Sequence, residues 1–185
     1  IIFTAISTHS GEELLCAKVH LNLKKKYKNI ISIIIPRHIH RAHEIKEELN
    51  QIGLNVYIHS SNKNIPNNTD IYLVDTFGET KSFLKLSKIT FMGKSIYGYG
   101  GQNPIEAARL GNRIIHGPNI ENFVEVYNFL KKLGISTKIK SYKDLEKLII
   151  KFNRKKNYSN QIIKKLAYTG KQILFNNEKE INKYF

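Results

Sequence analysis

The run "IISIIIP", residues 30–36, decides the fold class of this 185-residue chain. Five of its seven residues are isoleucine, so the run shows no alternation between apolar and polar positions. An unbroken β-branched run is typical of a strand in a parallel sheet whose two faces are both covered by helices. The rest of the chain should therefore supply those helices.

Segments of the required kinds lie on both sides of this run. Short apolar runs predict strands at 1–7, 54–60, 70–76, 89–93, 113–118 and, more briefly, 135–140. Apolar residues at helical spacing predict helices at 11–27, 39–52, 78–87, 121–133 and 142–153. This alternation indicates an α/β fold: a Rossmann-like, doubly wound parallel sheet of about six strands with helices on both faces.

The same patterns predict how the chain is organised. We expect a Rossmann-like domain over residues 1–155 and a basic helical tail over residues 156–185 that packs on or beside it. The chain begins at Ile1, inside the first predicted strand and without a Met, so we expect a piece of a longer protein with a domain missing before it. No run approaches the roughly 20 apolar residues of a membrane helix, and we expect no spanning segment.

The formal net charge is +15 and is concentrated toward the C-terminus. From Lys138 onward, 13 Lys/Arg and 4 Asp/Glu contribute +9 of that total. Two explanations stay open: a surface for phosphates, nucleic acid or an anionic membrane, or a coding bias toward Lys, Ile and Asn. A nucleic-acid-binding module would interleave aromatic and basic residues. Here the aromatic residues fall inside strand and helix patterns, so we expect no nucleic-acid partner.

Polar residues and glycines gather where the predicted strands end. They are Ser7 and Thr8 after the first strand, Arg37 and His38 after the second, Gly78 and Glu79 after the fourth, and Ser95 after the fifth. The carboxyl ends of parallel strands share one edge of the sheet, where doubly wound folds bind ligands. Simpler roles stay open: Ser7 and Thr8 could only cap a helix, and "DTFGE" (75–79) could only be a turn. The seven histidines show no metal-ligand spacing, so we expect no metal.

The stretch "YGYGGQNPIEAARLGNRIIHGPN", residues 97–119, has the composition of a ligand loop. It lacks the G-x-G-x-x-G order of a dinucleotide fingerprint. Gly100 and Gly101 would expose backbone amides at the start of a helix, where anions bind. Glu106 lies three residues after Asn103, where its carboxylate can accept hydrogen bonds from a ribose diol. The stretch therefore predicts a cradle for a nucleotide.

Six motifs resemble the C-terminal half of the 3-deoxy-D-manno-octulosonic acid (Kdo) transferases, which are GT-B glycosyltransferases. They are "STHSGEE" (7–13), "PRH" (36–38), "DTFGE" (75–79), "GKS" (93–95), "GGQNPIEAA" (100–108) and "GPNIENF" (117–123), in family order over about residues 3–150. The resemblance implies one half of a GT-B fold that binds CMP-Kdo, or CMP, without cofactor or metal. It implies inverting transfer to a lipid A precursor, which the missing N-terminal domain would hold. That domain would also supply the general base, so we expect no catalytic residue in this chain and no activity from it alone.

The resemblance also implies which residues meet the donor. They are Ser7, Thr8, Arg37, His38, Gly78, Glu79, Ser95, Gly100, Gly101, Gln102, Asn103 and Glu106. Arg37 and the amides after Gly100 would contact the phosphate or nucleotide, and Ser95 would lie near the phosphate. Glu106 would bind the ribose hydroxyls, and Glu79, with its neighbouring glycine, would line the cytosine side.

Some features depart from the family or go beyond it. Gln102 stands where the family usually has His, and Lys94 stands where it usually has Gly. By the same resemblance we expect the enzyme at the cytoplasmic face of the inner membrane, in lipopolysaccharide biosynthesis. Basic tail residues, namely Lys155, Lys156, Lys164 and Lys165, would hold it to anionic lipid. The alternatives are another GT-B-like enzyme, such as a uridine-nucleotide transferase or an epimerase, and a nucleotide-binding remnant without turnover.

Overall fold

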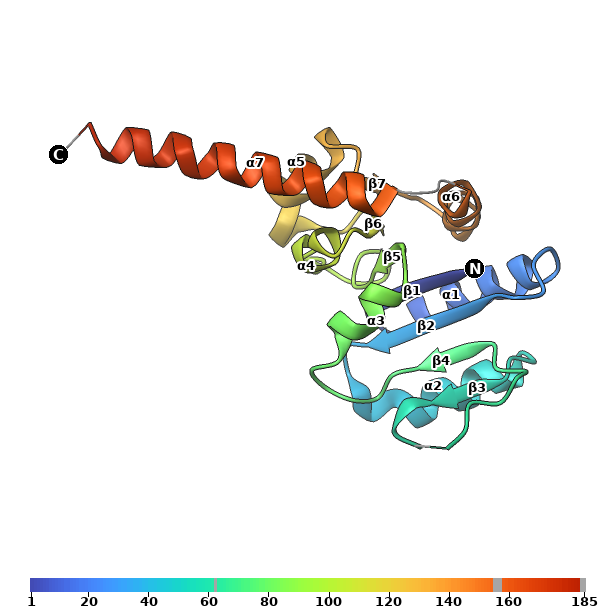
Figure 1. Cartoon of the computed structure of the whole chain (residues 1–185). Helices are drawn as coiled ribbons and strands as arrows, with labels where there is room; N and C mark the ends of the chain where they lie inside the picture. Colours follow the sequence, from blue (N-terminus) through green and yellow to red (C-terminus); the bar gives the residue numbers. More distant parts are fainter. Residues whose placement is uncertain (62, 155–157, 184–185) are drawn as a thin grey trace.

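The sheet of this protein is parallel throughout. The computed structural model describes residues 1–61, 63–154 and 158–183. The strands are β1 (Ile2–Thr8), β2 (Ile31–Pro36), β3 (Val56–Ile58), β4 (Ile71–Leu73), β5 (Ile89–Met92), β6 (Arg113–His116) and β7 (Ser136–Lys138). Their order is β3-β4-β2-β1-β5-β6-β7 (Figure 1). The predicted fold class is confirmed, with seven strands instead of about six, and the "IISIIIP" run forms β2 inside the sheet.

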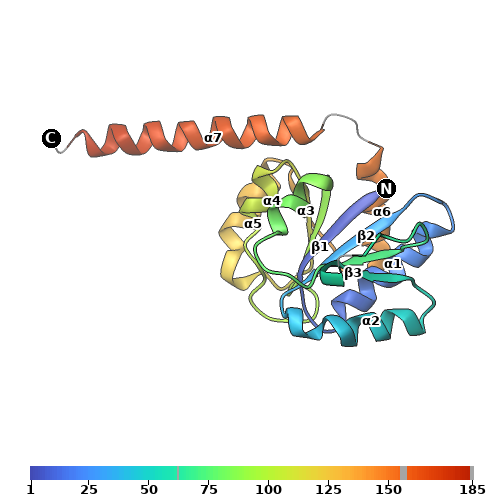
Figure 2. The ribbon, with the colours of Figure 1, turned by 60° about the horizontal axis from the view of Figure 1, so that its bottom comes forward.

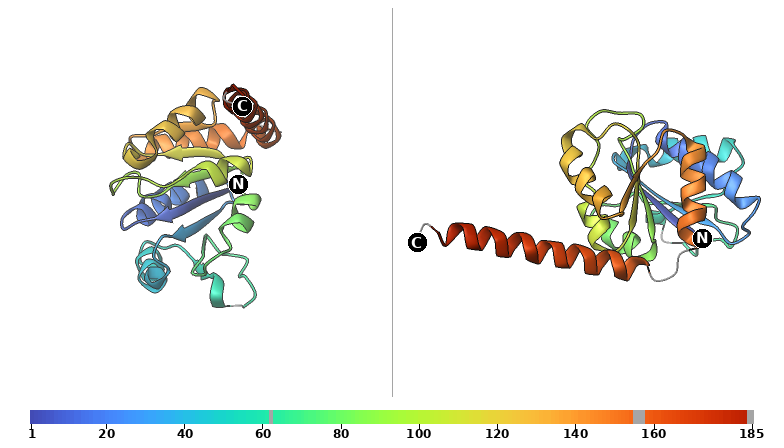
Figure 3. Two further views of the ribbon diagram at one scale, coloured as in Figure 1. Left: turned by 90° about the vertical axis from the view of Figure 1, so that its left-hand side faces the viewer. Right: turned by 90° about the horizontal axis from the view of Figure 1, so that it is seen from above.

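Helices cover both faces of the sheet (Figure 3). One buried core packs α1 (Glu12–Lys24), α2 (Ala42–Gln51) and α6 (Tyr142–Asn153) against the strands. A second core, on the other face, packs α3 (Thr80–Leu86), α4 (Ile105–Arg109), α5 (Val124–Lys132) and the start of α7 (Tyr158–Ile181). Short 3-10 turns complete the description: η1 (Ile39–Arg41), η2 (His59–Ser61) and η3 (Glu121–Phe123). Two cores on opposite faces are what a doubly wound sheet requires.

Strands β3 and β4 are three residues long, shorter than the seven-residue runs predicted for them. The polar ends of those runs leave the sheet, because their side chains bond to one another instead of continuing the ladder. Asp75 accepts hydrogen bonds from the Ser60 backbone nitrogen at 2.9 Å and from its hydroxyl at 2.5 Å. The loops at this edge therefore begin earlier than the apolar pattern indicates.

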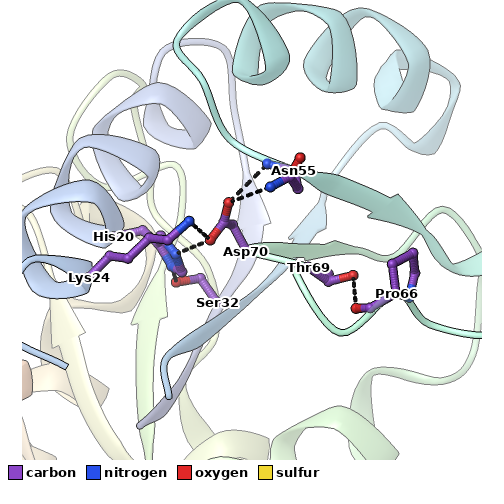
Figure 4. Close-up of polar contacts among 7 residues, drawn as sticks. All are labelled: His20, Lys24, Ser32, Asn55, Pro66, Thr69 and Asp70. Atoms are coloured by element: carbon purple, nitrogen blue, oxygen red, sulfur yellow. Dashed lines mark hydrogen bonds and ion pairs between the residues drawn. The ribbon is translucent and has the colours of Figure 1, made fainter. Parts of the chain in front are cut away.

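A buried polar cluster lies at the amino ends of the strands (Figure 4). His20 Nδ1 lies 2.7 Å from the Ser32 hydroxyl, and Nε2 lies 3.4 Å from Asp70 Oδ1. The Asp70 carboxylate accepts from the Asn55 backbone nitrogen at 3.0 Å and pairs with Lys24 at 2.5 Å. Every buried member thus has a partner, and the cluster ties α1 to the sheet at the edge opposite the predicted ligand site.

The start of α7 is docked on the domain. The Arg113 guanidinium stacks on two rings, 4.3 Å from the centroid of Phe152 and 3.2 Å from that of Tyr158. Ile162 is buried in the second core, and Leu166 packs against that core. These contacts fix the first turns of the predicted tail.

The rest of α7 projects from the domain (Figure 1, Figure 2). Residues 170–181 are all exposed. Lys164 and Lys165 are exposed on α7, whereas Lys155 and Lys156 lie outside the described residues. Within the described ranges, no helix combines the length and the apolar character needed to cross a bilayer.

Candidate functional site

The sheet order reverses between β1 and β5, which are neighbours. The chain leaves β1 toward β2 and leaves β5 toward β6, so the two loops diverge at the carboxyl edge, where doubly wound folds bind ligands. Their first residues are packed backbone to backbone: a Cβ on Gly93 would lie 2.3 Å from the Ser7 carbonyl oxygen. Ser7 and Lys94 both have left-handed backbones, with φ of 53° and 55°. Glycine adopts that conformation more readily than Lys does.

Glu12 holds these two loops together. Its fully buried carboxylate accepts hydrogen bonds from the backbone nitrogens of Lys94 (2.6 Å), Ser95 (2.9 Å) and Ile96 (2.9 Å). It also accepts one from the His9 nitrogen at 3.0 Å. A buried charge with four donors is a stable arrangement that fixes the loop after β5. Sequence analysis placed Glu12 only within the motif "STHSGEE" (7–13) and gave it no role of its own.

Ser95 lies inside the protein, not in the opening. The residue is fully buried, and its hydroxyl donates to the Met92 carbonyl at 2.5 Å and accepts from the Gly117 nitrogen at 2.8 Å. Its own N–H is taken by Glu12. Ser95 therefore shapes the loop from within, and a contact of its side chain with a ligand stays a prediction.

The glycine-rich loop is fixed by hydrogen bonds to the residues packed around it. Gly100, with φ 97°, donates its N–H to Glu121 Oε2 at 2.7 Å, and the Tyr127 hydroxyl donates to the Gln102 carbonyl at 2.9 Å. Asn103 Oδ1 accepts from the Ile105 nitrogen at 3.0 Å. Among the described residues, nothing accepts from the amides of 101–103. Helix α4 has only five residues, so the free amides belong to the loop and not to a helix terminus as predicted.

Glu106 borders an open hollow of about 700 Å³ between α3 and α4. Its carboxylate is half exposed and lies 3.2 Å from Lys81 Nζ. Asn103 lines the same hollow. A ribose diol that binds Glu106 must share the carboxylate with Lys81 or displace it.

Gly78 and Glu79 lie after β4, in a loop with few attachments. Gly78 has φ 85° and open space around it. The Glu79 carboxylate accepts from the Thr76 hydroxyl and lies 3.0 Å from His59 Nε2. The hydrogen bond from Thr76, aided by His59, lowers the pKa of Glu79. Helix α3 follows this loop, and its Lys81 forms the ion pair with Glu106.

Arg37 and His38 lie on the other side of β1, at the end of β2. The Arg37 nitrogen donates to the Thr8 carbonyl at 3.0 Å, and its side chain is exposed. The His38 ring stands edge-on to His9 with centroids 5.4 Å apart. Burial lowers the pKa of His9, with Arg37 and Lys94 among the nearby cations that lower it further.

The predicted residues thus form three groups along one edge. Ser7, Thr8, Arg37 and His38 lie at the ends of β1 and β2; Ser95, Gly100, Gly101, Gln102, Asn103 and Glu106 follow β5; Gly78 and Glu79 follow β4. Sequence reasoning missed two supports beneath them, His116 and Tyr127, whose rings lie 4.2 Å apart between centroids and are tilted by 43°. Within the described parts, no three His, Cys, Asp or Glu side chains are grouped to hold a metal.

No family model matches the chain. It is similar to proteins named 3-deoxy-D-manno-octulosonic acid transferase: 34% identical over 130 residues to that of Haemophilus influenzae, covering 70% of this chain and 30% of the relative. To that of Rickettsia prowazekii it is 30% identical over 177 residues, covering 95% and 37%. A probable mitochondrial transferase of Arabidopsis thaliana is 34% identical over 146 residues, covering 75% and 33%. The chain spans about a third of the length of these relatives.

Solved structures share the fold. The crystal structure of the C-terminal CMP-Kdo binding domain of WaaA from Acinetobacter baumannii aligns with a TM-score of 0.80 at 23% identity, covering 88% of this chain and 84% of that one. The glycotransferase of kitacinnamycin aligns with a TM-score of 0.55 at 10% identity, covering 92% and 40%. The sheet and its helices therefore have the same fold as these solved domains.

Proposed function

We propose that this chain, which belongs by sequence with the 3-deoxy-D-manno-octulosonic acid transferases, is the part of such an enzyme that binds the donor CMP-Kdo. Its curated relatives carry that name, and the similar solved domain is described as CMP-Kdo binding. The chain spans about a third of the length of those relatives, and the proposal assigns the acceptor and the general base to a region that this sequence does not include.

The observation that carries this proposal is that the backbone amides of residues 101–103, in the loop after β5 at the β1–β5 switch point, have no acceptor among the described residues. Consecutive N–H groups of this kind suit the oxygens of a phosphate. Glu106 is one turn away and takes the ribose hydroxyls, while Gly78 and Glu79 face the cytosine. Arg37 approaches from the end of β2 and adds a forked, permanent cation for the phosphate.

In the proposed reaction an acceptor hydroxyl attacks the anomeric carbon of Kdo as the bond from that carbon to the CMP phosphate oxygen breaks. CMP leaves with the bonding electrons and gains negative charge, while a general base takes the proton of the hydroxyl. Attack opposite to the leaving group inverts the anomeric centre. The amide cradle and Arg37 stabilise the charge that develops on CMP. The base and the lipid A precursor belong to the region that this sequence does not include, and neither cofactor nor metal takes part.

The proposed setting is the cytoplasmic face of the inner membrane, during lipopolysaccharide synthesis. The exposed lysines of α7, Lys164 and Lys165 among them, would meet anionic lipid headgroups, where each contributes about 1 kcal/mol. Charge reversal of Lys164 and Lys165 should then weaken sedimentation with anionic vesicles. Unchanged sedimentation would remove the membrane from the proposal without affecting the donor site.

The nucleotide test is calorimetric titration with CMP, with UMP and UDP as controls. A CMP domain binds CMP more tightly because Glu79 and its loop meet the cytosine edge. Tighter binding of UMP or UDP would instead support a GT-B enzyme that uses uridine nucleotides. Absence of binding to all three would contradict the proposed donor site.

A further inference from the structure

We infer that His59 is a positioning residue for Glu79, and through Glu79 for loop 75–79, where the donor base is proposed to bind. The ligand in this inference rests on the proposed function, whereas the contacts do not. His59 follows β3 directly and begins η2, so its ring lies at the carboxyl edge of the sheet. Sequence reasoning gave it no role.

Both nitrogens of the His59 ring have partners. Nε2 lies 3.0 Å from Glu79 Oε2, and Nδ1 lies 2.6 Å from the Tyr72 hydroxyl. The edge of Phe83 meets the ring at a centroid distance of 5.3 Å and an angle of 88°. The side chain is 24% exposed. A ring with both nitrogens bonded and one side packed has a single orientation, and this one points Nε2 at Glu79.

The hydrogen atoms can be assigned from the partners. An ionised carboxylate only accepts, so Nε2 carries the hydrogen and donates it to Glu79. In the neutral ring Nδ1 is then an acceptor, which the Tyr72 hydroxyl satisfies. Thr76 donates its hydroxyl to the same Glu79 oxygen. The hydrogen bonds therefore form a chain in one direction: Tyr72 donates to His59, and His59 donates to Glu79. The chain ends on the Glu79 carboxylate and holds it in place.

Loop 75–79 depends on this bond more than its sequence indicates. At its start, Asp75 is tied to Ser60 of η2 by the two hydrogen bonds given above. Further along, Phe77 is 77% exposed, and a Cβ added to Gly78 would meet nothing within 4 Å among the described residues. Glu79 is the second point of attachment, again to η2. Loss of the His59 bond should free Glu79 while the fold and the Asp75 attachment persist.

Two substitutions at one position separate positioning from simple packing. His59→Gln places an amide nitrogen close to where Nε2 lies, so it can still donate to Glu79. His59→Asn places its amide close to Nδ1 and leaves Glu79 without that donor. Both variants lose the packed ring, so a packing role alone should affect them equally.

Two measurements are made on each variant: hydrogen exchange of residues 75–80 without nucleotide, and CMP affinity by titration. We expect His59→Asn to exchange faster there and to bind CMP about tenfold more weakly, the loss typical of a hydrogen bond to a charged group. We expect His59→Gln to stay within about threefold of wild type in affinity. Tyr72→Phe, which removes only the outer bond, should fall between them.

The outcomes of this inference and of the proposed function are distinct. If wild type binds CMP and both His59 variants bind and exchange alike, the positioning role is wrong and the donor site stands. If wild type does not bind CMP, the donor proposal fails. Hydrogen exchange of residues 75–80 then decides the role of His59. Faster exchange in His59→Asn but not in His59→Gln supports the role, and equal exchange rates in the two variants overturn it.

Discussion

Oε1 of Glu12 lies 2.9 Å from the backbone nitrogen of Ser95, and both residues are fully buried where β1 and β5 diverge. The bond joins the first turn of α1 to the loop that carries the glycine-rich cradle. The path of that loop therefore depends on a carboxylate that no ligand needs to touch.

The Glu12 carboxylate is predicted to stabilise the fold strongly. Glu12→Gln should lower the free energy of unfolding by about 2–4 kcal/mol, because an amide nitrogen would face N–H groups that need an acceptor. Urea denaturation measures the change. Glu47→Gln, on the exposed side of α2, is the matched control and should have almost no effect. A loss at Glu12 no larger than at Glu47 would mean that the four bonds are not formed in solution.

Lys94 is predicted to be a strained position. Lys94→Gly should raise stability by roughly 0.5–1 kcal/mol, since a left-handed backbone costs other residues about 1–2 kcal/mol and Gly almost nothing. Lys94→Ala removes the same side chain but keeps the strain, so it should not stabilise. Thermal unfolding of the two variants separates them. Equal melting temperatures for Gly and Ala would contradict a positive φ at this residue.

Gly100 and Gly170 form a second matched pair. A Cβ on Gly100 would lie 2.5 Å from Asn122 Nδ2, and φ there is 97°. Gly100→Ala should cost about 1–3 kcal/mol of stability and distort the cradle, weakening CMP binding about tenfold or more. Gly170→Ala has open space on α7 and should leave binding unchanged while raising helix content. Unimpaired CMP binding by Gly100→Ala would place the nucleotide elsewhere.

His116 is predicted to make stability depend on pH. Burial lowers its pKa from 6.5 to about 4, although its hydrogen bond to the Gly117 carbonyl at 2.7 Å opposes the shift. As the pH falls, the His116 ring of the unfolded chain therefore becomes protonated at a higher pH than the ring in the folded protein. The stabilisation is complete above about pH 6.5 and is lost as pH falls toward 4, by about 3 kcal/mol.

His116→Asn isolates this contribution. Asn keeps a donor for the Gly117 carbonyl but does not titrate between pH 4 and 6.5. The difference in unfolding free energy between wild type and variant should shrink as the pH is lowered through that window. Parallel curves would show that His116 titrates normally.

Arg113 is predicted to hold the start of α7. Arg113→Leu removes a cation stacked on Phe152 and Tyr158 and should cost about 1–2 kcal/mol. Hydrogen exchange at residues 158–166 should quicken, while residues 170–181, which project already, should not change. Arg154→Leu, at an exposed position near the end of α6, is the control. Slow exchange at 158–166 in Arg113→Leu would assign the docking to Ile162 and Leu166 instead.

Much of this fold is specified by residues that are close together in the sequence, so those parts could be predicted. The isoleucine run of β2 and the helical spacing of α1 and α6 specify their elements without help from distant residues. Ser95 was expected just after β5 and lies there for the same reason. The ends of β3 and β4 were predicted wrongly. Asp75 and Ser60, 15 positions apart in the sequence, bond to each other, and those ends leave the sheet.

The supports of the site were beyond prediction because they are contacts between distant segments. Glu12 meets Ser95 across 83 positions, and His59 meets Glu79 across 20. Nothing in the residues next to Glu12 or His59 specifies those partners. Spacing along the chain shows which side chains leave a strand end, whereas only the packed sheet shows which of them meet.

Calorimetric titration of CMP into wild type, Glu106→Ala and Glu47→Ala tests the central claim, that the loop before α4 and Glu106 hold the nucleotide. We predict that Glu106→Ala weakens CMP binding about tenfold, by loss of hydrogen bonds from the ribose hydroxyls to a charged group, and that Glu47→Ala does not. CMP binding that survives Glu106→Ala unchanged would contradict the claim and move the donor site away from this loop.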